Sequence, residues 1–500
     1  MASTPTNDDT VVDPTYLGNI SAFFTPGDIG CMSAQGIDLG SYDGVRHHAT
    51  DIYEQTRVGN MPLGGTPWTA SRVQTFLNWI STGFPMGTPP VPAPPVTDSD
   101  QNSATTTPGV RLRKNLASLS QAEIDLLKKA FSGIMALDPT DPTSPVNPNS
   151  YFGLAALHGL PNAYCMHHVD TYNPWHRVYV KAFEDALRSV DGCDDVTLPY
   201  WDITTTVPAV VYEAPFASYT LPIDIGDPND YPAGYVTQRY DAATIEANLL
   251  QAPSVPSDIA DALPSPQWGS FQGGGFQQYI VEGHDDGHVS CGATMSDQSV
   301  AAYDPIFWFF HCNWDRLWES WQVLASATTV PGFTATLDGN TDWLPLALDP
   351  YSDTSNQTIV WPDISYDALA GDAKAAPVRI AGHALAERAF RVAPTSRVSL
   401  RVKDIDRMNI PGTFIVQLMA DGEPIARRAF FQPRAPQTCA TCRKQALVSL
   451  DFRLDQDLIT GRTLSVAIEA PALGKGEAGN IPLTQAGNPT INVRLLLTED

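Results

Sequence analysis

The sequence predicts a mainly helical core that follows a small helical module and precedes an antiparallel β-sandwich. Three observations support this fold class. Apolar residues recur at helical spacing before about residue 345, and their period changes to two after it. A stretch rich in Pro, Thr and Ser separates the first module from the core. We therefore expect a module over residues 1–84, a linker over 85–108, a core over 109–345 and a β-rich domain over 346–500.

The first module is expected to be helical over Ile37–Leu39, Val45–Val58 and Ala70–Gly83, with apolar residues on one face of the last segment. It weakly resembles small c-type cytochrome domains. It contains no Cys-x-x-Cys-His motif, so covalent haem is not expected. We interpret it as a structural or lid module.

The β-rich domain is predicted from segments that alternate or are rich in β-formers. They are Val398–Val402, Thr413–Met419, Ala446–Leu454, Thr463–Ile468 and Thr490–Leu497. Clusters of Gly and Pro separate them, a pattern typical of a β-sandwich.

The composition excludes several classes of partner. The net charge is −25, from 30 basic and 55 acidic residues, which argues against nucleic acid and anionic membrane surfaces. The chain has no run of about 18 apolar residues that would span a membrane. Its first residues lack the basic and apolar regions of a secretory signal, so we expect a cytoplasmic location, with export by a route that the sequence does not reveal as the alternative.

Two histidines four residues apart, His284 and His288, are expected on one face of a helix, where their rings can converge on one ion. A third, His311, lies in a later helix that Asp304 can cap and Pro305 can open. Three neutral imidazoles without a thiolate suit copper or zinc, and one such triad does not distinguish the two metals.

A second set of histidines lies upstream and contains His158, His167 and His176. Asn173 and Pro174 are typical of the start of a helix, which is expected to run to Arg188 with His176 in its first turn. Two sets of three histidines, each leading into an amphipathic helix, favour a paired metal site.

Both clusters resemble the copper-binding regions of the type 3 copper proteins, which are the tyrosinases, catechol oxidases and mollusc haemocyanins. The matching motifs are His-x8-His ending in Pro-Trp-His-Arg at 174–177, Pro-Tyr-Trp-Asp at 199–202, His-x3-His at 284–288, Asp-Pro-x-Phe-Trp at 304–308 and Asp-Arg-Leu-Trp at 315–318. The resemblance covers about residues 150 to 325. It implies a four-helix-bundle core with long irregular loops and a centre of two copper ions.

Carried over by position, the resemblance implies that one copper is bound by His158, His167 and His176, and the other by His284, His288 and His311. Cys165 stands two residues before His167, where fungal tyrosinases and mollusc haemocyanins have a cysteine joined to the histidine by a thioether. The resemblance implies the same bond here, although a small buried thiol is the commoner fate of a cysteine. Phe310 departs from the pattern, because the family usually has His-His at 310–311.

Two acidic residues beside the second set have expected roles. Asp285 follows the first ligand, where many active tyrosinases have Asn, and Glu282 falls near a glutamate that positions a water in the family. Either carboxylate can accept the proton of an incoming phenol, whose free pKa is about 10. The alternative is that both are solvated loop carboxylates. Asp202 and Asp315 are interpreted as structural ion-pair partners of Arg177 or Arg316, and the alternative is that they accept hydrogen bonds from groups around the metal ligands.

The seven cysteines do not suggest a disulfide framework, because their number is odd and most are scattered. Cys439 and Cys442 form a Cys-x-x-Cys pair that is similar to a motif associated with copper loading in some fungal tyrosinases. Such a pair can bind a soft ion, and a redox motif or a local disulfide is the alternative.

The β-rich domain is similar to one that often keeps fungal and plant tyrosinases latent by laying a bulky side chain over the coppers. Phe430 and Phe431 are the candidates for this plug, and the alternative is that both face the core of the sandwich. Met295 and Gln298 are our hypotheses for the rim of the site.

The resemblance implies a tyrosinase-type copper oxidase that uses dioxygen to hydroxylate monophenols and to oxidise ortho-diphenols to ortho-quinones. Its partners would be small phenols, and self-association is left open. Two alternatives stand: a catechol or ortho-aminophenol oxidase without hydroxylation, and a haemocyanin-like oxygen carrier. The sequence does not separate them, because access to the metals depends on side chains at the rim.

Overall fold

A computed structural model of the 500-residue chain describes residues 11, 14–25, 28–29, 32, 37–57, 61, 68–81, 84–86, 111–227, 229–337, 339–371, 397–471 and 479–495. The chain forms two compact units, Met1–Ala104 and Thr105–Asp500. In the described part of the chain, no helix is both long and apolar enough to cross a membrane.

The first unit contains the helices α2 (Tyr42–His47), α3 (Ala49–Arg57) and α4 (Ala70–Ser81), with α3 packed against α4. Its core is aromatic, because Phe76 and Trp79 of α4 are fully buried beside Trp68 and Tyr16. The helix expected at Ile37–Leu39 is not formed. The Asp38 side chain accepts the backbone N–H of Gly40 (2.9 Å), a local bond that competes with helix formation.

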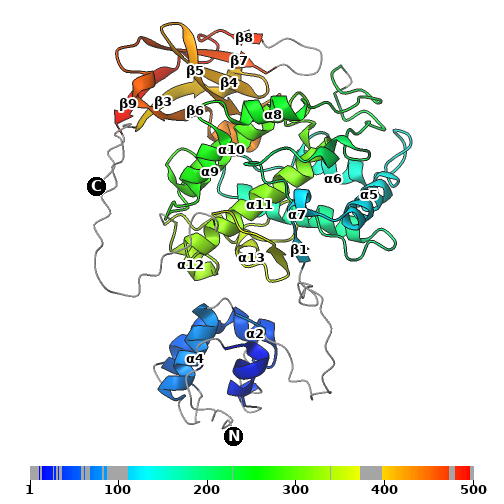
Figure 1. Ribbon diagram of the computed structural model, residues 1–500, viewed down its shortest axis with the longest axis vertical. Helices are drawn as coiled ribbons and strands as arrows, with labels where there is room; N and C mark the ends of the chain where they lie inside the picture. The colour runs from blue at the N-terminus through cyan, green and yellow to red at the C-terminus, as the bar shows by residue number, and fades with distance from the viewer. Residues whose placement is uncertain are drawn as a thin grey trace. The chain divides into compact units, whose positions relative to one another are not determined.

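The second unit begins with helices, and Figure 1 shows α7, α10 and α11 in the middle of this part. Its helices are α5 (Gln121–Met135), α6 (Tyr151–His158), α7 (Tyr172–Arg188), α8 (Ala242–Leu249), α9 (Val255–Ala262), α10 (Gly275–Cys291), α11 (Ile306–Leu324), α12 (Val330–Thr334) and α13 (Ser355–Ile359). Helix α7 packs against α5 and α11, and α11 packs against α10. This arrangement is the mainly helical core that the sequence predicts.

The starts of the core helices are set by local hydrogen bonds. Ser120 and Glu123 form a capping box at α5, and Ser150 caps α6. At α11, the Asp304 side chain accepts the N–H of Ile306 (3.2 Å), as expected. Helix α7 begins earlier than expected, with Thr171 rather than Asn173 as its N-cap residue.

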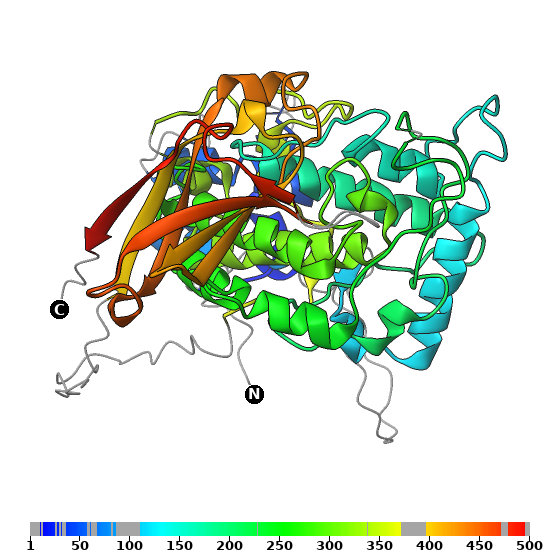
Figure 2. The ribbon, with the colours of Figure 1, turned by 90° about the horizontal axis from the view of Figure 1, so that it is seen from above.

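The C-terminal part consists of two antiparallel sheets, and Figures 1 and 2 show their strands gathered together beside α8, α9 and α10. One sheet has the order β6-β3-β9, formed by Leu447–Asp455, Arg397–Asp406 and Thr490–Leu495. The other has the order β5-β4-β7-β8, formed by Glu423–Phe430, Phe414–Ala420, Leu464–Ala470 and Gly479–Ile481. A short helix, α14 (Ala440–Lys444), precedes β6. We call residues 397–495 the β-domain.

Two findings differ from the expectations for this region. Residues 346–366 pack on the helical core, because α13 contacts α7 and the strand β2 (Ile364–Tyr366) pairs with β1 (Arg111–Arg113). The β-domain therefore begins later than residue 346. Strand β5 was not expected, since Arg427 and Arg428 interrupt its apolar pattern, yet it forms a long ladder with β4.

Candidate metal centre

Six buried histidines gather in one cluster within the helical core. They are His158 at the end of α6, His167 in the loop that follows, His176 in α7, His284 and His288 in α10, and His311 in α11. The ring centroids are 5.0–5.6 Å apart within the upstream three and 4.5–5.4 Å apart within the downstream three. The two halves meet where the rings of His176 and His311 stack, 4.6 Å apart.

The ligand atoms of the cluster converge in groups suited to single ions. Those of His284, His288 and His311, the predicted downstream triad, all lie within 4.8 Å of one another. Upstream, His158 belongs to two such groups, one with His176 and His311 and one with Cys165 and His167. The upstream rings are therefore neighbours, although their nitrogens are not gathered in the predicted combination.

Three of the rings are oriented by hydrogen bonds at Nδ1. The acceptors are the Tyr172 carbonyl for His176 (2.8 Å), the Asp285 carboxylate for His284 (2.9 Å) and the Met295 carbonyl for His288 (2.8 Å). A partner at Nδ1 fixes the tautomer that leaves Nε2 with a free lone pair. Each of these rings is thereby prepared to bind a metal through Nε2.

The remaining ring nitrogens fit a metal centre. Within the six histidines, the buried ring nitrogens without a hydrogen-bond partner are Nε2 of His176 and His284, Nδ1 of His311 and both nitrogens of His158 and His167. Buried polar atoms without a partner are rare in proteins. Burial lowers the pKa of His176 and His288 to about 3, so these imidazoles are neutral, the form that binds copper. Six neutral imidazoles in this arrangement fit two copper ions.

The two predicted carboxylates are buried, so the alternative that they are solvated is wrong. Asp285 Oδ1 accepts from His284, while its Oδ2 accepts from Nε2 of His168 (2.7 Å) and from the backbone N–H of Phe431 (2.9 Å). Burial raises the pKa of Asp285, and the N–H of Phe431 acts in the opposite direction. Asp285 therefore joins a candidate ligand to the β-domain.

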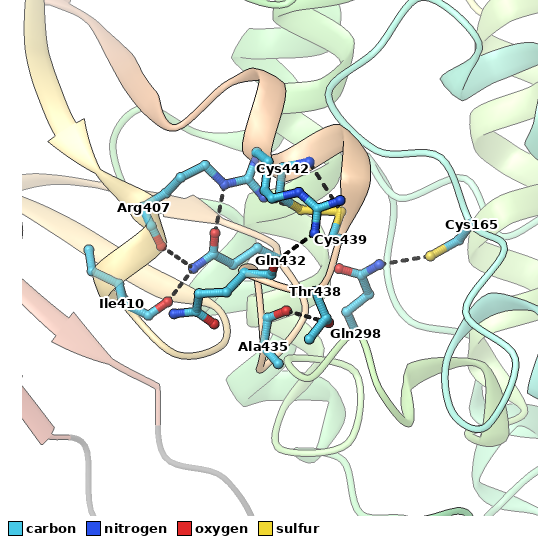
Figure 3. The surroundings of a disulfide bond; sticks show 11 residues. Cys165, Gln298, Arg407, Ile410, Gln432, Ala435, Thr438, Cys439 and Cys442 are labelled. Carbon is cyan, nitrogen blue, oxygen red and sulfur yellow. Dashed lines mark hydrogen bonds between the residues drawn. A yellow bond between two sulfur atoms is a disulfide. The ribbon is translucent and has the colours of Figure 1, made fainter.

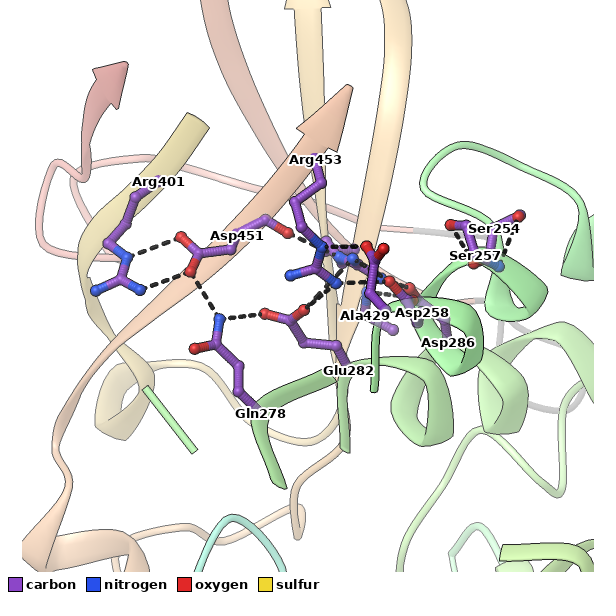
Figure 4. A network of polar contacts seen from close by, with 12 residues as sticks. Ser254, Ser257, Asp258, Gln278, Glu282, Asp286, Arg401, Ala429, Asp451 and Arg453 are labelled. Atoms are coloured by element: carbon purple, nitrogen blue, oxygen red, sulfur yellow. Dashed lines mark hydrogen bonds and ion pairs between the residues drawn. The ribbon is translucent and has the colours of Figure 1, made fainter. Parts of the chain in front are cut away.

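Glu282 also faces the β-domain rather than the histidine rings. Its oxygens accept from Gln278 (2.9 Å) and Arg453 (3.1 Å), and Arg428 lies 3.4 Å away. Figure 4 shows this network, in which Asp258 and Asp286 also take part. We call the arginines Arg428 and Arg453, with the acids Asp258, Glu282 and Asp286, the interface network. The roles of Glu282 and Asp285 as proton acceptors stay predictions.

Both candidate plug residues, Phe430 and Phe431, contact histidines of the helical core. The ring of Phe431 is fully buried and stacks on the ring of His288, with centroids 4.1 Å and planes 19° apart. It also lies 5.3 Å from the ring of His167 and 5.9 Å from that of His284. Phe430 instead stacks on His168 (4.1 Å) and on Phe414 in the sandwich. Phe431 is thus the residue placed against the histidine cluster.

Phe310 fills the space where the family pattern has a histidine. Its ring lies 4.7 Å from that of His288 and 5.7 Å from that of His284. Gly287 makes this possible, because a Cβ at that position would lie 2.9 Å from the Phe310 ring. The departure from the family pattern replaces a polar neighbour of the ligands with an apolar one.

Met295 and Gln298 are buried and do not form an exposed rim, and Cys165 lies beside His158 and His167. Gln298 Nε2 donates to the Cys165 sulfur (2.7 Å), and the Met295 side chain is fully buried. Cys165 is a free thiol whose pKa is raised to about 12 by burial. The expected thioether to His167 stays a prediction.

Cys439 and Cys442 are joined by a disulfide, which was the alternative to copper loading. Figure 3 shows the pair beside Arg407 and Gln432. Arg407 donates to the Cys442 sulfur (3.2 Å) and to the side chain of Gln432 (2.9 Å), the residue that follows Phe431. In this oxidised state the pair has no thiolate to offer a metal, so its role in copper loading stays a prediction.

Asp315 and Asp202 have the structural roles expected of them. Asp315 pairs with Arg177 (2.5 Å) and Arg113 (3.0 Å), and Asp202 pairs with Arg316 (3.3 Å). Sequence reasoning missed His168, Asp286 and Arg428. His168 directly follows the candidate ligand His167, so its position in the sequence could have indicated that it lies near the site. The residues next to Arg428 give no indication that its side chain is buried.

The fold and the site together define a protein with a helical core in which six buried histidines are compatible with a centre of two metal ions. Residues 148–324 match the family model of the common central domain of tyrosinase. Among curated relatives, Hemocyanin 1 of Megathura crenulata is 29% identical over 272 residues, which are 50% of this chain and 7% of that protein. Tyrosinase of Aspergillus oryzae is 25% identical over 449 residues, covering 61% of this chain and 80% of that protein. The chain spans 43% of the haemocyanin units G and H of Sepia officinalis.

Solved structures show the same fold. The tyrosinase from Burkholderia thailandensis at high pH has a TM-score of 0.57 at 20% identity, covering 77% of this chain and all of that one (100%). A functional unit from Octopus hemocyanin has a TM-score of 0.54 at 20% identity, covering 76% of this chain and 99% of that one. The histidine-bearing core of this chain, residues 148–324, therefore matches the central domain of the tyrosinase family, and the chain shares the fold of tyrosinases and haemocyanins.

Proposed function

We propose that this chain is a tyrosinase-type copper oxidase that hydroxylates monophenols and oxidises ortho-diphenols to ortho-quinones with dioxygen. The observation that carries the proposal is the ring of Phe431, which stacks on His288 at 4.1 Å. The space over His288 therefore accepts a flat six-membered ring, as a phenol requires. We call this space the aromatic slot.

When bound by the six histidines, two copper ions would supply the electrons that reduce dioxygen and a Lewis-acidic position for a phenolate oxygen. The residues of the chain supply orientation and a dry environment. The carbonyls of Tyr172 and Met295 and the carboxylate of Asp285 hold three imidazoles in one tautomer. The rings of Phe307 and Phe310 pack on the histidines and exclude water from them.

The proposal includes latency, because Phe431 occupies the aromatic slot while the β-domain is docked. The strand β5, which ends at Phe430 immediately before Phe431, is held by the interface network, in which Arg428 bonds Asp258 and Asp286. A phenol needs the same space, so the β-domain has to move before a phenol binds. Phe430 contributes to docking through His168 and leaves the slot itself free.

Oxygen uptake by the copper-loaded full chain tests the proposal. Tyrosine and then a catechol are supplied before and after opening with a mild detergent. We expect uptake with both substrates only after opening. The Phe431→Ala chain should respond to both without detergent, whereas the matched Phe430→Ala chain should stay mostly latent. An opened, copper-loaded chain that oxidises neither substrate would refute the proposal.

The same assay addresses two further functions. A haemocyanin-like oxygen carrier is favoured by the haemocyanin relatives at 29–30% identity. Reversible oxygenation of the opened chain without turnover would support it. Uptake with catechol alone would support a catechol or ortho-aminophenol oxidase without hydroxylation.

A further inference from the structure

Among the residues that the structure describes, Arg407 is a buried cation that forms no ion pair. It begins the short helix η6 (Arg407–Asn409) after β3 and is 2% exposed. Burial lowers the pKa of its guanidinium to about 10, while the charge of Asp285 acts in the opposite direction. The guanidinium is therefore charged at neutral pH, and a buried charge is costly unless an anion pairs with it. Arg407 thus favours any anion that forms beside it.

The partners that Arg407 does have are neutral. Its Nη2 donates to the sulfur of Cys442 (3.2 Å), and its Nε donates to the side chain of Gln432 (2.9 Å). The guanidinium also lies over the ring of Phe430, 4.7 Å from the centroid. Figure 3 shows Arg407 in contact with both the disulfide and Gln432. Reduction of the disulfide would place a thiolate at Cys442, which is the anion that Arg407 lacks.

The two sulfurs of the disulfide differ in their access to solvent. Cys442 is 4% exposed, whereas Cys439, at the start of α14, is partly exposed. In thiol–disulfide exchange a thiolate attacks one sulfur and expels the other, and a stabilised thiolate leaves faster. Access favours attack at Cys439, and Arg407 favours Cys442 as the leaving thiolate. The other cysteines that the structure describes are free thiols, namely Cys165, Cys193, Cys291 and Cys312.

We infer that Cys439 and Cys442 form a thiol–disulfide exchange site for a dithiol reductant, and that their reduction weakens the hold of the β-domain on Phe431. A thiolate of the reductant attacks Cys439 and forms a mixed disulfide, while the electron pair of the S–S bond goes to Cys442. The second thiolate of the reductant then expels Cys439, and the reductant leaves as a disulfide. One thiol proton of the reductant passes to Cys439 and the other to solvent, so Cys442 stays a thiolate.

Gln432 links the redox state of the pair to the residue that covers the histidines. It directly follows Phe431, and its side chain accepts from Arg407. Hydrogen bonds between ionised partners are about twice as strong as neutral ones. A Cys442 thiolate therefore draws the guanidinium away from Gln432 and from the ring of Phe430. The exchange site is independent of the proposed function, whereas its effect on latency rests on that function.

Redox titration of the metal-free full chain tests the site without any turnover. The chain is equilibrated at neutral pH in mixtures of reduced and oxidised dithiothreitol, and the free thiols of Cys439 and Cys442 are labelled and measured by peptide mass spectrometry. Arg407→Met removes the cation and Arg407→Lys keeps it. Arg443→Met is the matched control, because Arg443 is the exposed neighbour of Cys442 in α14. With glutathione as the reductant, the mixed disulfide should form on Cys439.

We expect Arg407→Met to disfavour the reduced form about tenfold, because the thiolate loses a charge-assisted hydrogen bond. For a two-electron couple this is about 30 mV. Arg407→Lys and Arg443→Met should stay within about twofold of the wild type, since the first keeps the charge and the second removes only a solvated one. Equal equilibria in the wild type and Arg407→Met, a glutathione adduct on Cys442, or a disulfide that dithiothreitol does not reduce in the folded chain would overturn the inference.

Amide exchange of the metal-free wild-type chain is a second test that needs no arginine variant to fold. We expect dithiothreitol to speed exchange of the Phe431 N–H, which donates to Asp285, by about fivefold or more, as for the loss of one ordinary hydrogen bond. Amides of α5 in the helical core are the internal control and should not change.

The double variant Cys439→Ser with Cys442→Ser separates the thiolate from the loss of the covalent link. It has neither the S–S bond nor a thiolate, so Phe431 should exchange as slowly as in the oxidised wild type, with or without dithiothreitol. Unchanged exchange at Phe431 in the reduced wild type, or fast exchange in the double variant, would contradict the inference. If the opened chain oxidises no phenol, the proposed function fails, and these two measurements still decide whether the exchange site exists.

Discussion

Two buried ionic networks flank the histidine cluster, and they join different parts of the chain. In the first, Arg113 pairs with Glu184 (2.8 Å) and Asp315 (3.0 Å), and Arg177 pairs with Asp315. All these residues belong to β1, α7 and α11. In the interface network, the cations come from β5 and β6, and the acids come from α9 and α10. The first network is therefore internal to the core, and the second crosses to the β-domain.

This difference means that the first network stabilises the histidine site itself, whereas the interface network stabilises the docking of the β-domain on the core. The first network fixes α7 and α11, which carry His176 and His311, whether or not the β-domain is docked. Burial alone would raise the pKa of Asp315, but Arg177 and Arg113 hold it below its usual value. For Glu282 burial outweighs Arg453 and Arg428, and its pKa is raised. Glu282 is thus less well compensated than Asp315, as expected if the proposed latency depends on the opening of this contact.

Arg113→Met should have the largest effect, because it leaves Glu184 and Asp315 buried with less compensation. We expect the free energy of unfolding of the whole second unit to fall by about 3–5 kcal/mol, measured by urea denaturation. Lys128→Met is the control within the same unit, since its partner Glu213 is 57% exposed, and it should cost at most about 1 kcal/mol. Equal effects of the two variants would contradict the role of the internal network.

Arg428→Met should cost about 3 kcal/mol, since Arg453 still pairs with Asp258 and Glu282. Unlike Arg113→Met, it should act on docking, so that amide exchange at β5 and oxygen uptake without detergent both rise. Arg427→Met is the control, because neighbouring strand residues face opposite sides. A fall in global stability with β5 still protected would show that the two networks do not act separately.

Asp138 is an acid that belongs to neither network, and it allows a comparison with the acids that pair with arginine. Among the residues that the structure describes, no arginine pairs with Asp138. It accepts from Tyr219 (2.7 Å) and from the N–H of Phe152 (2.7 Å), and burial raises its pKa to about 6. The folded chain therefore keeps a proton that the unfolded chain has lost, and stability should fall as the pH rises from about 4 to 6. We expect the fall in the free energy of unfolding across this pH range to be about 2–3 kcal/mol smaller in Asp138→Asn, measured by denaturation at several pH values. An unchanged slope would refute the assignment.

Arg397→Ala should have the smallest effect. Arg397 also joins the β-domain to the core, through Asp261 (3.1 Å), but its side chain is 42% exposed. A pair so open to water contributes at most about 1 kcal/mol. We expect no measurable change in latency, as followed by oxygen uptake. Loss of latency in this variant would mean that surface charges, rather than the buried interface network, keep the β-domain docked on the core.

Sequence reasoning succeeded where the signal was local. The spacing of His284 and His288 on one helix and the cap at Asp304 are properties of a few neighbouring residues, and the structure brings the expected histidines together. The period of two predicted most strands of the β-domain. Strand β5 was missed because Arg428 is buried only through acids more than 100 residues away.

The other differences between prediction and structure also arise from contacts between residues that are far apart in the sequence. Met295 and Gln298 were expected at the rim from their position in a loop, but the fold turns the Met295 carbonyl toward His288 and the Gln298 amide toward Cys165. Asp285 was expected as a solvated or catalytic carboxylate, because its contacts with His168 and Phe431 arise only in the folded chain. Partners brought together by tertiary structure leave no trace in residue spacing.

Anomalous diffraction at the copper edge, from crystals of the copper-loaded full chain, tests the central claim most directly. We expect two copper ions per chain, one among His158, His167 and His176 and the other among His284, His288 and His311, with the Phe431 ring covering them. A single ion in the cluster, or copper found only at Cys439 and Cys442, would contradict the account.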